Sequence, residues 1–312
     1  MSALVGCVPA MAGSINPVDR PPPTAEDIGA RLDDGDAAKL ADKAAGSWTR
    51  VCEKTKPRDR STIDGYEKAC AAGSAKECMH LGRVHMCGAG VDRNPSAALP
   101  LFDKACKAKD ADGCHMLANT LLSGATGQRE TAAGVRLYAA TCESGSARLC
   151  GVLGSMLTGL RKSWSTSRGI DYLDKACAGG ELDSCADLAL AALGEGGPRE
   201  PGRAITAAAR GCKAGHADSC AALGGARLLT NGDKAEAIRE LERACDAGSA
   251  MGCAFLGFCY HRGLGVVQDR DTAIRVFRKA CDGGSVSACS NVAKITNGAP
   301  APPPDPQDLL RD

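Results

Sequence analysis

The chain has 312 residues, of which 38 are basic and 37 acidic. Because these charges nearly cancel, no overall basic field would attract nucleic acid or an anionic lipid surface. No apolar run in the sequence approaches the length of a membrane-spanning helix. Aromatic residues make up only 3% of the chain, which favours closely packed helices over a β-sheet.

A cysteine pair with a spacing of eight residues recurs seven times along the chain. The pairs are Cys70 and Cys78, Cys106 and Cys114, Cys142 and Cys150, Cys177 and Cys185, Cys212 and Cys220, Cys245 and Cys253, and Cys281 and Cys289. Their first cysteines lie 36, 36, 35, 35, 33 and 36 residues apart. A period of this length is typical of stacked helical hairpins. Since such an array buries its core between neighbouring units, we predict one elongated all-α solenoid.

The constant spacing also predicts disulfides. In the first pair, Cys70 ends a helix, Gly73 lies in the turn, and Cys78 lies about one turn inside the next helix. The two sulfurs would face each other at a separation that a disulfide allows. Closing a loop of about nine residues contributes roughly 2.5 kcal/mol in the chain-entropy model. We therefore predict seven disulfides in an extracytoplasmic protein, periplasmic or secreted; the alternative is buried, reduced cysteines.

The ends of the chain differ from this repeating region. Residues 1–23 contain a proline-rich tether, and Leu4-Val5-Gly6-Cys7 is similar to the bacterial lipobox, in which the cysteine is lipidated. The motif predicts a possible lipid anchor through Cys7, although only three residues precede it and a signal peptide needs a longer apolar region. Residues 298–312 form a proline-rich tail that we expect to be disordered.

Between these ends the spacing divides the chain into helical units. Residues 24–73 are expected to form an N-terminal cap and a degenerate repeat, with a helix over about 37–53, and residues 285–297 a C-terminal capping helix. Residues 74–284 would form six full units, over 74–109, 110–145, 146–180, 181–215, 216–248 and 249–284.

Two local patterns recur inside these units. Asn94 before Pro95, Asp233 and Asp271 are predicted to cap the second helices of the first, fifth and sixth units. A Leu-Gly step lowers helix propensity, so its recurrence indicates that glycine is needed where a partner helix approaches closely. The step occurs at Leu81-Gly82, Leu153-Gly154, Leu223-Gly224 and Leu256-Gly257.

These motifs carry a family resemblance. The pattern Leu-Gly-x-x-Tyr-x-x-Gly-x-Gly-Val-x-x-Asp-x-x-x-Ala-x-x-x-Phe-x-Lys-Ala-Cys, complete over 256–281, resembles the Sel1-like repeat, a relative of the tetratricopeptide repeat. The cysteine pair resembles the cysteine-rich branch typified by the Helicobacter cysteine-rich proteins. The resemblance implies a right-handed α/α superhelix with about one disulfide per unit. Residues 160–168 and 194–203 depart from the pattern, and the fifth unit is shortened at Asn231-Gly232.

The resemblance also implies a function. Most such arrays are scaffolds whose first helices present a concave face to a protein or peptide, so we expect a protein or peptide partner, a monomer, and no cofactor. Variable positions after the Leu-Gly step would contact the partner, namely Arg83, Asn119, Ser155 and Phe258. The other interpretation is that these four residues are solvated or serve packing.

Some members of the cysteine-rich branch are described as penicillin-binding proteins with weak β-lactamase activity, which is the alternative function. A serine β-lactamase needs Ser-x-x-Lys and Lys-Thr-Gly, and neither motif is present. The chain also lacks Gly-x-Ser-x-Gly, His-Glu-x-x-His and a P-loop motif. We therefore expect no catalytic residues, and the scaffold is the favoured prediction.

Histidines and unpaired cysteines leave three further questions. His80 and His115 stand beside paired cysteines, but ligand spacing of the zinc-binding kind is missing, so no metal site is expected. Cys52 and Cys87 occupy equivalent positions in adjacent units and form a possible eighth disulfide. Cys259 lies inside a predicted helix and is expected to be a small buried hydrophobic residue.

Overall fold

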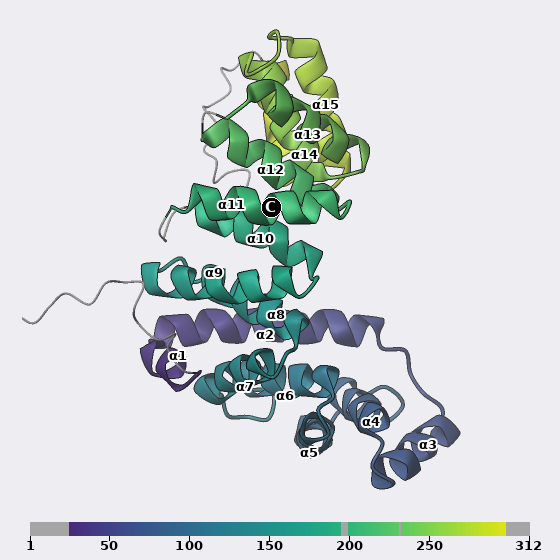
Figure 1. The fold of residues 1–312 in the computed structure, drawn as a ribbon. Helices are drawn as coiled ribbons and strands as arrows, with labels where there is room; N and C mark the ends of the chain where they lie inside the picture. Colours follow the sequence, from purple (N-terminus) through teal and green to yellow (C-terminus); the bar gives the residue numbers. More distant parts are fainter. Residues whose placement is uncertain (1–24, 195–198, 231, 298–312) are drawn as a thin grey trace, which may run out of the picture.

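The structure is a computed structural model that describes residues 25–194, 199–230 and 232–297, so Cys7 and the proline-rich tail lie outside the described residues. The described residues form sixteen α-helices and no strand (Figure 1). The helices are α1 (Ala25–Arg31), α2 (Asp34–Lys54), α3 (Arg60–Ala71), α4 (Ala75–Cys87), α5 (Pro95–Lys107), α6 (Ala111–Ser123), α7 (Thr131–Glu143), α8 (Ala147–Thr158), α9 (Ser163–Ala178), α10 (Leu182–Leu193), α11 (Pro201–Lys213), α12 (Ala217–Leu229), α13 (Lys234–Asp246), α14 (Ala250–Arg262), α15 (Arg270–Asp282) and α16 (Val286–Thr296).

Helical hairpins stack one on another from α3 to α16. The six hairpins are α4–α5, α6–α7, α8–α9, α10–α11, α12–α13 and α14–α15. Each second helix also packs on the first helix of the next hairpin, and α16 closes the stack against α15. Figure 1 shows this order rising from α3 to α15. The predicted all-α hairpin solenoid is therefore confirmed.

The turn between successive hairpins has the same geometry in each unit. The residue three positions after the first cysteine has a positive φ in all seven turns, and it is glycine in six of them, as at Gly73 (φ 99°). This left-handed conformation strains a residue that carries a Cβ. Lys109 (φ 63°) takes the position in the remaining turn. The turn directs the chain back so that the two cysteines of each pair face each other.

Disulfides join the two helices at every one of these turns. All seven pairs with eight-residue spacing are bonded, with Cα atoms 4.3 to 4.8 Å apart. The bonds join Cys70 to Cys78, Cys106 to Cys114, Cys142 to Cys150, Cys177 to Cys185, Cys212 to Cys220, Cys245 to Cys253, and Cys281 to Cys289. The structure therefore has the seven pairings that the spacing predicts.

The other cysteines also have defined places. Cys52 and Cys87 form an eighth disulfide with a Cα separation of 5.1 Å. Among the cysteines that the structure describes, Cys259 alone is free, and it is buried. Burial also raises the pKa of its thiol to about 12, which disfavours the reactive thiolate.

The Leu-Gly step lies where the second helix of a hairpin crosses the first, as predicted. A Cβ atom on Gly154 of α8 would lie 2.7 Å from Cγ of Leu173 and 2.9 Å from the carbonyl oxygen of Gly169, both in α9. A Cβ atom at Gly82 or Gly257 would similarly approach a phenylalanine ring at 2.5 or 2.9 Å. Glycine therefore lets the two helices of a hairpin pack at short distance.

We expect Gly154→Ala to lower the free energy of unfolding by about 1–3 kcal/mol, because the added methyl group forces α8 and α9 apart. Gly46→Ala is the matched control. It also replaces a glycine inside a helix, but a Cβ atom at this position would have no neighbouring atom within 4 Å, so the change should raise stability by about 0.5–1 kcal/mol through helix propensity. Urea unfolding measures both variants, and equal stabilities would contradict this explanation of the Leu-Gly step.

Helix caps agree with the sequence at two of three predicted positions. Asn94 caps α5, with Pro95 as its first residue, and Asp233 caps α13 by accepting hydrogen bonds from Ala235 N and Glu236 N. The prediction for the sixth unit was wrong. Asp269, not Asp271, caps α15, since its carboxylate accepts from the backbone N–H groups of residues 271 and 272. The helix thus begins one residue after Asp269.

Candidate partner-binding face

The first helices of the hairpins share one face of the stack, and the N-terminal segment covers part of it. We call the face formed by α4, α6, α8, α10, α12 and α14 the first-helix face. Helix α2, in the segment expected to form an N-terminal cap and a degenerate repeat, packs mainly on α6, with smaller contacts to α4 and α7 (Figure 1). Helix α1 packs on α7.

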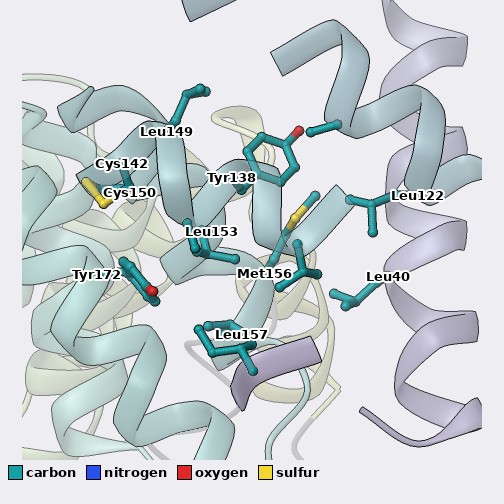
Figure 2. Packing of buried hydrophobic residues seen from close by; sticks show 14 of the residues in the cluster. Leu40, Leu122, Tyr138, Cys142, Leu149, Cys150, Leu153, Met156, Leu157 and Tyr172 are labelled. Carbon is teal, nitrogen blue, oxygen red and sulfur yellow. A yellow bond between two sulfur atoms is a disulfide. The ribbon is translucent and has the colours of Figure 1, made fainter. Parts of the chain in front are cut away.

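Apolar residues of α2 hold it on this face. Leu40 and Ala44 are 1% and 0% exposed and belong to the same buried cluster as Leu122 of α6 and Met156 of α8. Figure 2 shows Leu40 beside Leu122 and Met156. One turn further on, Trp48 stacks on Phe102 with ring centroids 5.7 Å apart. Residues 40, 44 and 48 thus form the stripe that a helix with one buried face requires.

Polar contacts join α2 to three of the four residues predicted to bind a partner. Asn119 Nδ2 donates to the carbonyl oxygen of Ala44 (3.3 Å), and Arg83 Nη2 donates to Thr55 Oγ1 (3.1 Å). At Ser155 the contact is made by its carbonyl oxygen, which accepts from Lys43 Nζ at 3.0 Å. Three of the four positions therefore contact α2 or Thr55, which caps its C-terminal end, within the same chain.

Two of the four predicted partner-binding residues are corrected by this packing. Asn119 is fully buried beneath α2, and Phe258 is only 9% exposed within the cluster of α13, α14 and α15. Neither side chain offers surface to an incoming partner. Arg83 and Ser155 are partly exposed. The position within the repeat did not predict exposure, because in two units the side chain at that position points into the protein.

An ion-pair cluster fixes the N-terminal end of α2. Asp33 caps the helix in a capping box with Asp36. Lys162, in the short loop between α8 and α9, lies 2.6 Å from Asp33 Oδ2 and 2.7 Å from Asp36 Oδ1. The hydrogen bonds that Lys162 donates to Asp33 and Asp36 raise the pKa of its ammonium group. At the other end, the Cys52–Cys87 disulfide joins α2 to α4. Helix α2 is thus attached at both ends and along its length.

Beyond α2, no other described helix outside the hairpin stack covers the first-helix face. A cavity of about 610 Å³ lies along α10, α12 and α14 and the turns that precede α14 and α16. Its apolar lining includes Ala186, Leu190, Met251 and Ala254. A cavity of this size and mixed lining is in the range of protein ligand sites. We call this region, defined by the lining residues of α10, α12 and α14, the open section.

Carboxylates gather in the open section. Asp183 and Asp187 lie one turn apart on α10, and Asp218 lies on α12. The side chain of Asp187 is exposed to solvent, yet neighbouring protein atoms partly desolvate its carboxylate. This desolvation raises the pKa of its carboxyl group, and the charges of Asp183 and Asp218 act in the same direction. Ser155 Oγ donates to Asp187 at 2.6 Å, and nearby Lys43 opposes the shift.

The two histidines that stand beside cysteines pack against tyrosines. His80 stacks on Tyr66 at 5.6 Å between ring centroids, and His115 Nδ1 lies 2.9 Å from the Tyr138 hydroxyl oxygen. Burial lowers the pKa of His115 to about 4, and the charge of Arg148 adds to this effect. His115 is therefore neutral near pH 7. Among the described residues, Cys212, Cys220 and Glu240 lie close enough together to resemble a set of metal ligands. The two cysteines, however, are bonded to each other as a disulfide.

His115 makes stability depend on pH. Below about pH 6.5 the unfolded chain binds a proton that the folded protein takes up only near pH 4. The contribution of neutral His115 to the free energy of unfolding is therefore fully present above pH 6.5. It is lost as the pH falls toward 4, and the loss is at most about 3 kcal/mol. Urea unfolding at pH 7 and 4.5 should show a smaller loss for His115→Asn, which keeps a partner for Tyr138. Equal losses in the variant and the parent protein would contradict this role.

The described residues contain no helix that is long and apolar enough to cross a membrane. Their eight disulfides point to an oxidising, extracytoplasmic environment.

Comparison with known proteins places the repeats in a family. The family described as "Sel1 repeat" matches residues 78–110, 148–181 and 250–285. The middle match spans the shortened loop of the third unit, so the departure at residues 160–168 does not remove this unit from the family. A comparison with curated proteins finds no sequence match.

Solved structures of the same repeat type are similar to the chain. A protective antigen from uropathogenic Escherichia coli strains, which displays an SLR fold, is 24% identical with a TM-score of 0.57. The match covers 75% of this chain and 51% of that protein, so the chain spans about half of its length. A Sel1 repeat protein from Oxalobacter formigenes is 23% identical with a TM-score of 0.51, over 68% of this chain and 89% of that one. The chain therefore contains three Sel1 repeats within a helical solenoid of the fold seen in these structures, and its many disulfides are consistent with the cysteine-rich branch.

Proposed function

We propose that the protein is an extracytoplasmic scaffold that binds a protein or peptide partner on the open section of its first-helix face, which we take to be the concave face. One observation carries this proposal. Helix α2 packs on α6, with smaller contacts to α4 and a hydrogen bond to α8, as a helical ligand would, whereas the 610 Å³ cavity over α10, α12 and α14 is uncovered in the described part of the chain. The face is thus suited to packing against a helix or peptide.

The charge of the open section favours a basic partner segment. Its three aspartates repel one another, and this repulsion adds to the effect of burial in raising the pKa of Asp187. A lysine or arginine placed among them would remove this repulsion and would be steered toward the site. Lys43 of α2 already lies close enough to Asp187 to lower its pKa. We therefore propose a partner that presents lysine or arginine beside apolar side chains.

The disulfides support binding as well as stability. Each repeat disulfide joins the second helix of one hairpin to the first helix of the next, which makes the stack more rigid, so less conformational entropy is lost on association. The same bonds support a periplasmic or secreted location, and lipidation of Cys7 would place the scaffold at a membrane surface. The hydrolase alternative stays a prediction, which turnover of a chromogenic β-lactam by the oxidised protein would test.

A pair of designed peptides tests the proposed site. We expect a labelled amphipathic helix with leucines on one face and lysines on the other to bind, as measured by fluorescence anisotropy, and its glutamate counterpart not to bind. The double variant Asp187→Asn with Asp218→Asn should weaken binding about tenfold, since two exposed ion pairs are lost. Asp92→Asn, an exposed aspartate outside the cavity, is the control. Equal binding of both peptides, or no effect of the double variant, would contradict the proposal.

A further inference from the structure

A second cavity lies on the other part of the first-helix face, and its charge is opposite. It has a volume of about 370 Å³ and lies between the C-terminal half of α2 and the helices α4, α6 and α8. Four cationic side chains line it: Arg50 and Lys54 from α2, Arg83 from α4, and Arg148 from α8. Asp112 is the single carboxylate in the lining. We call this cavity the basic pocket.

The cations of the basic pocket are not saturated by protein acceptors. Arg83 donates from Nη2 to Thr55, but its Nε is buried without a hydrogen-bond acceptor among the described residues. Arg148 pairs with Asp112, which leaves other donors of its guanidinium group available. In the described part of the chain no carboxylate lies within ion-pair distance of Arg50 or Lys54. Four positive charges around one cavity repel one another, and an anion would relieve this repulsion.

The remaining lining is apolar. Met79 and Met116 are each 7% exposed, and Val51 of α2 is partly buried beside them. Methionine side chains adapt to apolar groups of different shape. His115, neutral at physiological pH, adds no further charge. A bare inorganic anion would use the cations and leave the apolar lining without a contact.

We propose that the basic pocket binds the C-terminal carboxylate of a peptide whose last residue is apolar. Guanidinium groups match the planar carboxylate with paired hydrogen bonds, and the methionines with Val51 would receive the apolar side chain. The volume suits a terminal residue and little more. This site shares no lining residue with the open section, so it stands independently of the proposed function.

Isothermal titration calorimetry of the full chain with three probes tests this assignment. The probes are N-acetyl-Ala-Ala-Leu with a free carboxylate, the same peptide as its C-terminal amide, and inorganic phosphate. We expect the acid to bind at least tenfold more tightly than the amide or phosphate. Arg83→Gln and Arg148→Gln should each weaken binding of the acid about tenfold or more, which is the range for a hydrogen bond to a charged group. Arg278→Gln on α15, outside both cavities, should leave binding unchanged.

The outcomes distinguish ligand binding by these arginines from a purely structural role. Arg148 is half-exposed, so its replacement should leave the thermal midpoint unchanged even if Arg83→Gln loosens α2. Arg83→Lys, which keeps the charge, should restore part of the affinity. Equal binding of acid and amide, tighter binding of phosphate, no binding of the acid, or an unchanged affinity in Arg148→Gln would each overturn the proposal. If the lysine peptide did not bind at the open section, the proposal for the basic pocket would not be affected.

Discussion

Replacing Leu40 with aspartate is expected to release α2 from the first-helix face while the hairpin stack stays folded. Leu40 is 1% exposed among residues of α6 and α8, so the change removes a buried leucine, which costs about 2–5 kcal/mol. It also places a carboxylate in an apolar site, which adds several kcal/mol. Among the described helices, α2 packs chiefly on α6, and no other helix makes a comparable contact with it. The Cys52–Cys87 bond would nevertheless keep α2 attached to α4.

Hydrogen exchange followed by mass spectrometry measures this release. Amides over residues 34–51 should lose protection, whereas those over 182–193 and 217–229 should keep theirs. Lys39→Asp is the control, because it introduces the same residue at the adjacent, exposed position of α2. Unchanged protection of α2 in Leu40→Asp, or loss of protection through the whole stack, would contradict the packing described above.

Removing the Cys52–Cys87 disulfide is expected to destabilise the protein more than removing any disulfide between successive hairpins. Its cysteines are separated by 35 positions, against 8 for each repeat pair. In the chain-entropy model, opening the larger loop costs about 4 kcal/mol and opening the smaller one about 2.5 kcal/mol. The double variant Cys52→Ser with Cys87→Ser also frees the C-terminal end of α2, so its exchange protection should fall.

The matched control is Cys212→Ser with Cys220→Ser, which opens one repeat disulfide and leaves α2 attached. Urea unfolding without reductant compares the two double variants. A smaller loss of stability in the Cys52 and Cys87 variant, with α2 still protected, would show that the helix is held by packing alone.

Local features of the fold could be predicted from the sequence because their causes lie within one repeat. The cysteine spacing predicted the turns between successive hairpins, since a turn and two helix ends fit between the two sulfurs. The Leu-Gly step predicted the close crossing at Gly154. The cap of α15 was misplaced because Asp269 and Asp271 lie only two residues apart at the start of the helix, and the choice depends on backbone geometry at that turn.

The packing of α2 could not be predicted in the same way. The apolar residues 40, 44 and 48 indicate a helix with one buried face, but spacing does not say which surface covers that face. The ion pairs that position α2 join Asp33 and Asp36 to Lys162, more than a hundred residues away. Burial of Asn119 follows from this long-range contact. The sequence predicted contact with a separate partner at these positions, whereas residues 83, 119 and 155 contact the α2 segment of the same chain.

The most direct test of α2 as the internal occupant of the first-helix face is zero-length crosslinking. Carbodiimide joins a lysine to a carboxylate only when the two are in contact, and Lys162 Nζ lies 2.6 Å from Asp33 and 2.7 Å from Asp36. Mass spectrometry of the oxidised, digested protein should find a peptide containing residue 33 or 36 joined to one containing residue 162. Crosslinks from Lys162 to other carboxylates alone, with none to α2, would contradict this placement of the helix.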